Sequence, residues 1–230
     1  MNNTRKAVWS KRTVCADFTD ILSELIRLDG FDGKTGKIEI NAWLKYIDFI
    51  RNYIGIEKNE SIFEIGCGSG AFLYPFFLKG HVVGGVDYSE SLINAAKSLW
   101  NAPIECLEAI QVPVLPLFDI VVSNSVFFYF PNLEYAEQVI QAMIRKSNRI
   151  IAILEVPDIR LYDVSEKMRR GEIGEEEYKM RYTGLEHQYY DKDWFRKIGE
   201  KYNLETIIFD QNIDQYKNNN YRFNCIFKKK

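Results

Sequence analysis

The sequence contains no apolar run that is long enough to cross a lipid bilayer. Its most apolar stretch, DIVVSNSVFFYF at residues 119–130, is short, and Ser123, Asn124 and Ser125 interrupt it. The first residues, MNNTRKAVWSKRTVC, lack the apolar core of a signal peptide. We therefore expect a cytoplasmic protein without a membrane partner.

Cysteine and histidine are scarce. The four cysteines are Cys15, Cys67, Cys106 and Cys225; no two have C-x-x-C spacing, and the chain has only two histidines. A structural zinc site needs four closely spaced ligands of these types, so we expect no metal. The scattered thiols indicate free cysteines in a reducing compartment.

An excess of charge of either sign is also missing. Thirty basic and 32 acidic residues leave a formal net charge of -2. This balance gives no electrostatic reason to expect a nucleic-acid partner or an anionic membrane. With 47% hydrophobic and 27% charged residues, 230 residues suit one globular domain, residues 1–230.

Short apolar strands alternate with amphipathic helices from residue 61 onward. Before this point, residues 18–28 and 42–54 predict two helices, the second with Asn41 as N-cap and a stop at Gly55. Strands are then expected at 61–65, 81–87, 103–109, 118–125 and 149–157, with helices at 70–80, 90–100 and 133–147. Such alternation is typical of a parallel sheet with helices on both faces.

Residues 157–190 interrupt this alternation, because they are highly charged and predict one or two helices. A helix at 191–202 follows, and two strands at 204–210 and 221–227 are separated by polar residues around 217–220. We predict that these strands form a C-terminal antiparallel hairpin. The expected fold class is α/β, with a Rossmann-like, seven-stranded, mostly parallel sheet and helices on both faces.

The stretch SIFEIGCGSG, residues 61–70, places Gly66, Gly68 and Gly70 directly after the first of these strands. A glycine-rich turn between a strand and a helix brings bare backbone and a helix N-terminus to the crevice where doubly wound sheets bind ligands. The glycines therefore indicate room for a small molecule. A plain tight turn is the alternative.

Asp87 ends the second strand, 17 residues after Gly70, where a carboxylate can accept the ribose hydroxyls of a nucleoside or cap the next helix. The letters GCGSGA also fit the dinucleotide pattern G-x-G-x-x-A, so an NAD(P)-dependent oxidoreductase is an alternative. The antiparallel ending opposes it. So does Glu64, since an acid just before the loop suits a cationic ligand better than a pyrophosphate.

Four segments resemble class I S-adenosylmethionine-dependent methyltransferases. FEIGCGSGAF at 63–72 is similar to the family's first motif, E/D-x-G-x-G-x-G. VVGGVDYSESLINAAK at 82–97, FDIVVSNSVFFYF at 118–130 and IIAILEVP at 150–157 resemble its later strands. The resemblance covers residues 61–156 and implies S-adenosylmethionine as cofactor and a methyl acceptor as second substrate.

The resemblance also implies roles for individual residues. The implied cofactor-binding set is Glu64, Gly66, Gly68, Gly70, Asp87, Tyr88, Glu108, Ala109, Asn124, Ser125, Trp9 and Arg12. In this assignment the glycines pass near the methionine and ribose, and Glu64 orients the loop or meets the amino group through water. Asp87 holds the ribose, and Tyr88 flanks the adenine.

The other assignments follow from chain position. Glu108 and Ala109 stand where the family binds the adenine amino group, and Asn124 with Ser125 begins the loop beside the methyl group. Trp9 or Arg12 is expected to fold over the methionine end.

His187, in GLEHQYYDKDW, is the candidate catalytic base, because histidine titrates near neutral pH and this one follows the fifth strand. The alternative is a surface or packed histidine. Tyr189 and Tyr190 are either pocket or core residues. His81 and Cys67 are interpreted as structural.

Residues 1–40 and 157–190 are interpreted as a cap over a core of residues 41–156, with 191–230 as the closing helix and hairpin. A cap suits a small-molecule methyl acceptor. The expected reaction is methylation at oxygen or nitrogen of a small polar metabolite or a nucleotide-linked sugar, by a possible homodimer. A non-catalytic partner subunit that binds S-adenosylmethionine is the remaining alternative.

Overall fold

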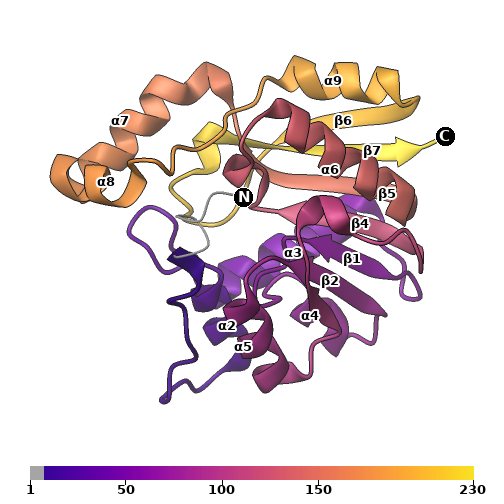
Figure 1. Ribbon diagram of the computed structural model, residues 1–230, viewed down its shortest axis with the longest axis horizontal. Helices are drawn as coiled ribbons and strands as arrows, with labels where there is room; N and C mark the ends of the chain where they lie inside the picture. Colours follow the sequence, from indigo (N-terminus) through magenta and orange to yellow (C-terminus); the bar gives the residue numbers. More distant parts are fainter. Residues whose placement is uncertain (1–7) are drawn as a thin grey trace.

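The computed structural model describes residues 8–230, which fold around one seven-stranded sheet (Figure 1). The strand order is β3-β2-β1-β4-β5-β7-β6. The strands are β1 (Ile62–Ile65), β2 (Val83–Asp87), β3 (Ile104–Cys106), β4 (Phe118–Asn124), β5 (Ser147–Pro157), β6 (Leu204–Asp210) and β7 (Arg222–Lys229). The first five pair in parallel, and β7 is antiparallel to both β5 and β6. The predicted fold class is confirmed.

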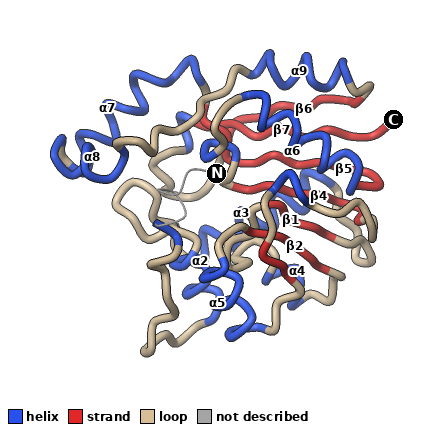
Figure 2. The backbone as a smooth tube through the Cα atoms, viewed as in Figure 1, coloured by secondary structure: helices blue, strands red, loops and turns tan. Residues whose placement is uncertain are grey.

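Helices cover both faces of the sheet (Figure 2). They are α2 (Ile21–Leu28), α3 (Ile40–Ile54), α4 (Tyr74–Leu78), α5 (Glu90–Trp100), α6 (Leu133–Lys146), α7 (Tyr162–Ile173), α8 (Glu175–Tyr182) and α9 (Lys192–Lys201). Side chains of α2 to α5 share one apolar core with Ile120 and Val122, whereas those of α6 and α9 share the other with Val121. Successive strand residues face opposite sides, so one β-branched run supplies both cores.

The central strand β1 fixes the position of the crevice. Its neighbours are β2 on one side and β4 on the other, so the connections leave β1 in opposite directions. At such a switch point the carboxyl ends of adjacent parallel strands diverge and leave space for a ligand. The residues that follow β1, β2 and β4 therefore meet at one edge.

Two predicted helix ends are confirmed: Gly55, with φ 72°, ends α3, and the hydroxyl of Ser89 accepts the amide of Leu92 at the start of α5. Two helices are shorter than predicted, since α2 begins at Ile21 and α4 spans only Tyr74–Leu78. The prediction of Asn41 as N-cap is wrong, because Glu39 holds the extended cap position and Asn41 lies in the first turn. Glu39 makes no side-chain cap hydrogen bond, so packing of the apolar face of α3 rather than a cap stabilises this helix.

The segment 157–190 forms α7 and α8, joined at Gly174 with φ 85°. Both helices lie at the left of Figure 1, beyond the carboxyl ends of the parallel strands, while the antiparallel β7 runs toward the right. This confirms the prediction of one or two helices. Of the predicted N-terminal cap, residues 1–7 lie outside the described part of the chain.

The four cysteines all lie in the described part and are free. Residues 8–230 contain no cluster of three or more histidine, cysteine, aspartate or glutamate side chains that could hold a metal ion. None of the helices described is both long and apolar enough to cross a membrane.

Candidate functional site

The glycine loop packs against the protein itself at all three of its glycines. Gly66, Gly68 and Gly70 have φ values of 78°, 54° and 91°, a region that L-residues rarely adopt. A Cβ would lie 2.5 Å from Val126 at Gly66 and 2.5 Å from Trp100 at Gly70, and it would overlap the Asp29 carboxylate at Gly68. The expected room for a ligand at these Cα positions is therefore filled by side chains.

The backbone amides of the loop are all used within the protein. Gly66 and Cys67 donate to Val86 O at 2.8 and 3.0 Å, Gly68 to Asp87 at 3.0 Å, Ser69 and Ala71 to Asp29 at 2.5 and 3.1 Å, and Gly70 to Cys67 O at 2.8 Å. A pyrophosphate needs such amides as donors. Because two carboxylates already occupy them, the loop cannot serve a dinucleotide in the usual way.

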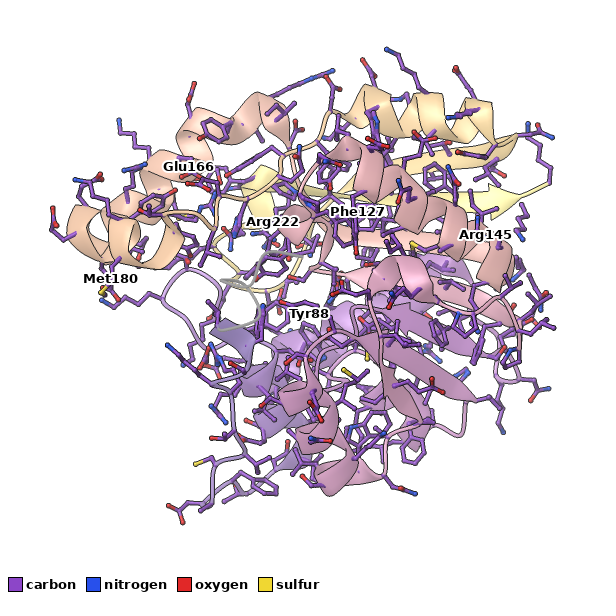
Figure 3. The ribbon with its side chains drawn as sticks, viewed as in Figure 1. Tyr88, Phe127, Arg145, Glu166, Met180 and Arg222 are labelled. Atoms are coloured by element: carbon purple, nitrogen blue, oxygen red, sulfur yellow. The ribbon has the colours of Figure 1, made fainter. Side chains whose placement is uncertain are left out.

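A cavity lies against this loop, with about 730 Å³ of empty space that includes open solvent. We call it the cofactor cavity. Its lining combines acids, loop backbone and aromatic rings: Trp9, Asp29, Phe31, Trp43, Glu64, Gly66, Cys67, Gly68, Phe72, Asp87, Tyr88, Leu92, Leu107, Ala109, Asn124, Ser125, Val126, Tyr129 and Phe130. Figure 3 labels Tyr88 at the end of β2, in the middle of the molecule.

Three carboxylates face the cofactor cavity. Burial raises the pKa of Asp29 to about 7 and that of Asp87 to about 6, and it raises the pKa of Glu64 well above its ordinary value. Glu64 is 2% exposed, and its Oε2 has no hydrogen-bond partner among the described residues. A buried acceptor without a donor is costly, so this cavity is complementary to a cationic ligand.

Most of the predicted cofactor residues line this cavity: Trp9, Glu64, Gly66, Gly68, Asp87, Tyr88, Ala109, Asn124 and Ser125. Three predicted residues do not. Gly70 packs on Trp100, Glu108 is outside the lining, and Arg12 binds Asp32 at 2.7 Å and lines a second cavity instead.

The sequence did not indicate Asp29 or the aromatic wall that Phe31, Trp43 and Tyr129 contribute. Asp29 stands in the DGFDG turn, where an aspartate normally stabilises local backbone. Its partner Ser69 is 40 residues away, so no local pattern connects the two.

A larger cavity opens beside the first, with about 1740 Å³ of empty space that includes open solvent. We call it the outer cavity. It shares Trp9, Asp29, Phe31, Ser125 and Tyr129 with the cofactor cavity. We call these five residues the junction.

The remaining lining residues of the outer cavity come from the N-terminal segment, from residues 169–187 and from residues 216–222, apart from Phe128. They include Lys11, Arg12, Arg169, Arg222, Met180, Tyr182, His187, Tyr216 and Asn218. Figure 3 shows Met180 on α8 and Arg222 nearer the sheet. Both segments predicted to form a cap therefore contribute walls to this cavity.

His187 lines the outer cavity, and Arg169 lies 2.6 Å from its Nδ1. Arginine has only hydrogen-bond donors, so Nδ1 must accept and the ring proton is held at Nε2. In this geometry the imidazole presents a donor at Nε2 rather than a lone pair. The role of His187 as a base stays a prediction.

The neighbouring residues Tyr189 and Tyr190 are core residues rather than pocket residues. Tyr190 is fully buried and its hydroxyl donates to Phe127 O at 2.8 Å, while Tyr189 binds Arg169 and Glu166. Neither lines either cavity. His81 is buried with Nδ1 2.9 Å from Glu60 O, as expected of a structural residue.

A sheet of order β3-β2-β1-β4-β5-β7-β6 is that of the Rossmann-like methyltransferase fold. Residues 63–151 match the methyltransferase domain family, and solved structures similar to this chain are class I S-adenosylmethionine-dependent methyltransferases. S-adenosylmethionine is the cofactor of this family. The NAD(P) alternative is therefore rejected.

Two curated relatives are multidomain synthetases. Peramine synthetase of Metarhizium rileyi is 31% identical over 127 residues, and a probable non-canonical nonribosomal peptide synthetase of Salinispora arenicola is 33% identical over 136 residues. These matches cover 49% and 54% of this chain but only 4% and 2% of the synthetases. The chain thus spans a small part of the length of these relatives.

Two solved structures share the fold along nearly the whole chain. The magnesium protoporphyrin IX methyltransferase of Synechocystis, with S-adenosylmethionine bound, is 15% identical and covers 100% of this chain and 93% of its own, with a TM-score of 0.61. The plantazolicin methyltransferase, in complex with a substrate analogue and S-adenosylhomocysteine, is 15% identical and covers 99% of each chain, with a TM-score of 0.66.

Proposed function

We propose that this chain transfers the methyl group of S-adenosylmethionine to an oxygen or nitrogen of a small polar metabolite or a nucleotide-linked sugar. The observation that carries the proposal is the pair of cavities. An acidic cavity on the glycine loop opens, through five shared residues, into a larger cavity with basic side chains.

The residues present fit this cofactor. Its net positive charge matches Asp29, Glu64 and Asp87, and the unpartnered Oε2 of Glu64 is an acceptor for a cationic group. Asp87 is the acid that would hold the ribose, with Tyr88 and Ala109 at the adenine and Asn124 and Ser125 toward the junction. When bound, the cofactor supplies a methyl group that its sulfonium has already activated.

The protein's own contribution is alignment and the exclusion of water. The rings of Trp9, Phe31 and Tyr129 line the junction, so the passage between the two cavities is largely apolar. Trp9 packs edge-on against Tyr129, with ring centroids 5.8 Å apart. This pair therefore connects the N-terminal segment to the residues that follow β4.

The charges of the outer cavity support the substrate class. Lys11, Arg12, Arg169 and Arg222 outnumber its acids, Asp29 and Asp32. Most of this basic charge is paired, because Arg12 binds Asp32, Arg169 binds Glu166, and Arg222 binds Glu155 at 2.6 Å. A substrate whose body carries negative charge, such as a nucleotide-linked sugar, fits this lining better than a cationic one.

Several of the similar proteins support a small-molecule or peptide acceptor, although one solved structure of similar fold is a small RNA methyltransferase. Two curated relatives are synthetases of peramine and of a nonribosomal peptide, and the plantazolicin enzyme was solved with an analogue of its substrate. A cytoplasmic location fits the four free thiols. The possible homodimer stays a prediction, which light scattering during size-exclusion chromatography tests.

His187 contacts the acceptor in this proposal. With Nδ1 held by Arg169, it donates through Nε2 and orients the acceptor. A base role would require the imidazole to leave Arg169.

The experiment has two steps. Isothermal titration calorimetry with S-adenosylmethionine, S-adenosylhomocysteine and NAD⁺ should give heat with the first two and none with the third. Release of S-adenosylhomocysteine is then measured with UDP-glucose and, as the uncharged control, with glucose. Heat only with NAD⁺ contradicts the proposal. Binding without turnover on any acceptor supports the alternative of a non-catalytic partner subunit.

A further inference from the structure

Ser125 at the junction and Glu155 in β5 both have an unusual backbone conformation. Ser125 follows β4 with φ 61°, and Glu155, near the end of β5, has φ 63°. The two positions are side by side, because Asn124 pairs with Leu154 and the amide of Ser125 donates to Leu154 O at 3.1 Å. Non-glycine residues in this conformation are strained, and such strain gathers at functional sites.

The strain brings Ser125 and Glu155 into contact. The Ser125 hydroxyl donates to Glu155 Oε2, the Tyr216 hydroxyl donates to Glu155 Oε1, and Arg222 forms an ion pair with Oε2 at 2.6 Å. Glu155 is 1% exposed, so the two hydroxyl groups separate its carboxylate from the cavities.

The direction of these hydrogen bonds follows from the charges. Glu155 forms an ion pair with Arg222 through its carboxylate, and a carboxylate has acceptors only. Burial raises the pKa of Tyr216 well above its ordinary value, so the phenol keeps its proton. The single hydrogen of each hydroxyl therefore points at Glu155.

A hydroxyl whose hydrogen is committed offers only lone pairs to other groups. Ser125 lines both cavities and Tyr216 lines the outer one, so both present acceptors to a substrate. The basic side chains Arg169 and Arg222 line the outer cavity but not the cofactor cavity.

We propose that the methyl acceptor atom of the substrate is a nitrogen or oxygen that carries a hydrogen, as in an amine, an amide or a hydroxyl, and that it donates a hydrogen bond through this hydrogen to Ser125. As the acceptor atom forms its bond to the methyl carbon and the bond from that carbon to sulfur breaks, the proton would leave to the solvent of the outer cavity. A carboxylate acceptor is rejected, since it would set its lone pairs against those of Ser125. The inference rests on the proposed function. Glu155 is a positioning residue, which fixes the direction of both hydroxyl groups.

Discrimination against a carboxylate acceptor should be strong. A carboxylate has no hydrogen to donate, so it would leave the hydrogen-bond acceptors of the site without a partner. The overall charge of the outer cavity acts in the opposite direction. Four basic side chains would favour an anionic acceptor group if charge alone decided. Hydrogen-bond complementarity therefore predicts a preference for acceptors that carry a hydrogen, whereas overall charge predicts a preference for anionic acceptors.

The test uses phenol, benzylamine and benzoate, three probes of similar size. Each is added with tritiated S-adenosylmethionine, and mild alkali then distinguishes a methyl ester from a methyl ether or amine. In parallel, saturation-transfer NMR measures probe binding to the protein saturated with S-adenosylhomocysteine. We expect phenol or benzylamine to exceed benzoate by at least about tenfold in both measurements. An equal response to the three probes at any level, zero included, or a preference for benzoate, overturns the inference.

Variants test whether Ser125 and Glu155 cause this substrate preference. Ser125→Ala and Glu155→Gln should each reduce the preference toward unity, the second because a glutamine amide donates to one hydroxyl and releases its hydrogen. Ser123→Ala is the matched control: Ser123 lies two residues earlier in β4, is fully buried and lines neither cavity. It should keep the wild-type preference.

Failure of the inference and failure of the proposed function are distinguishable. If calorimetry shows no binding of S-adenosylhomocysteine, the proposed function fails. If the ligand binds and benzoate is methylated or bound as well as phenol, the function stands and the inference is wrong. Should Glu155→Gln not fold, the preference of the wild-type protein still decides.

Discussion

Asp29 binds the amides of Ser69 and Ala71, which a phosphate would occupy in a dinucleotide site. With Glu64 and Asp87 it makes the cofactor cavity acidic on three sides. A sulfonium nucleoside is attracted by this arrangement, and a pyrophosphate is repelled. At the scale of single residues, the choice of cofactor thus depends on a few carboxylates.

Replacing Asp87 with asparagine tests the predicted ribose contact. We expect the affinity for S-adenosylmethionine to fall by about 10- to 100-fold, because a charged acceptor is lost. Calorimetry measures this. Asp119→Asn is the control, since Asp119 accepts from Ser61 at the opposite end of the strands. If Asp119→Asn weakens binding as much, the effect is one of stability and not of contact.

The raised pKa values of Asp29, about 7, and of Asp87, about 6, predict a dependence on pH. Binding of a cation requires the ionised acids, so the affinity for S-adenosylmethionine should rise from pH 5.5 to 8, by up to about tenfold per pH unit for each acid. S-adenosylhomocysteine lacks the sulfonium charge and should show a weaker dependence. Parallel slopes for the two ligands would exclude this explanation.

The same acids have the opposite effect on the ligand-free protein. Their folded-state pKa values lie above the ordinary value of 3.8, so the folded state binds protons more tightly than the unfolded state. The contribution of Asp29 and Asp87 to the stability of the folded state should therefore increase as pH falls from about 7 toward 4. In Asp29→Asn the trend should be shallower, which urea denaturation at several pH values measures.

Variants of His187 distinguish its role as a hydrogen-bond donor from its role as a general base. As a donor through Nε2, it should be partly replaced by glutamine, whereas alanine should lower turnover by about 10- to 100-fold. As a base, both variants should lose about 10²- to 10⁴-fold, and the rising limb of the pH–rate profile should disappear. Affinity for S-adenosylmethionine should hardly change in either case. Unaltered turnover in His187→Ala would remove this residue from the reaction.

The glycine loop is the element that joins fold and site. Its amides bind Val86 O, Asp87 and Asp29, so the loop connects β2 to the segment after α2. The strands β4 and β5 contribute in a related way, because strained Ser125 follows β4 and contacts strained Glu155 near the end of β5. The site is thus made where regular elements end.

Gly66→Ala tests the close approach to Val126. The Cβ would lie 2.5 Å from the Val126 side chain, so we expect a loss of stability of about 2–4 kcal/mol from contact and backbone strain together. Gly80→Ala is the control, with a similar φ of 85° and no atom within 4 Å of its Cβ. It should lose only the strain part, about 1–2 kcal/mol. Equal losses in urea denaturation would show that contact plays no part.

At the scale of the whole molecule, the two apolar cores and the sheet hold the cavities in place. The walls of the outer cavity come from the N-terminal segment, α7 and α8, and the residues between β6 and β7. These segments are far apart in the sequence, and a ligand that contacts them together should stabilise the folded state.

A ligand that binds only the folded state raises its stability by mass action. At 100 times its dissociation constant, S-adenosylhomocysteine should add about 2.7 kcal/mol and raise Tm by about 5–10 °C. Differential scanning calorimetry measures the shift, and NAD⁺ at the same concentration should give none. A shift that does not grow with ligand concentration would contradict specific binding.

The sequence by itself determined the order of strands and helices, the glycine loop and Asp87. These features are local: burial on both faces leaves β-branched runs, helices repeat every 3.6 residues, and a left-handed backbone requires glycine. The family resemblance then located most of the cofactor cavity. Element boundaries were less accurate: Asn41 was misplaced as a cap, and the helix predicted at 70–80 and the strand predicted at 103–109 are shorter in the structure.

Only the tertiary structure decided the partners of Asp29, the orientation of His187 and the cluster around Glu155. In each, side chains from segments 18 to 69 residues apart meet across packed elements. Sequence periodicity does not predict such contacts, because they depend on the twist of the sheet and on how the helices pack against it. The sequence therefore specified a binding fold, and the packing of distant segments decided which charges and hydrogens a substrate meets.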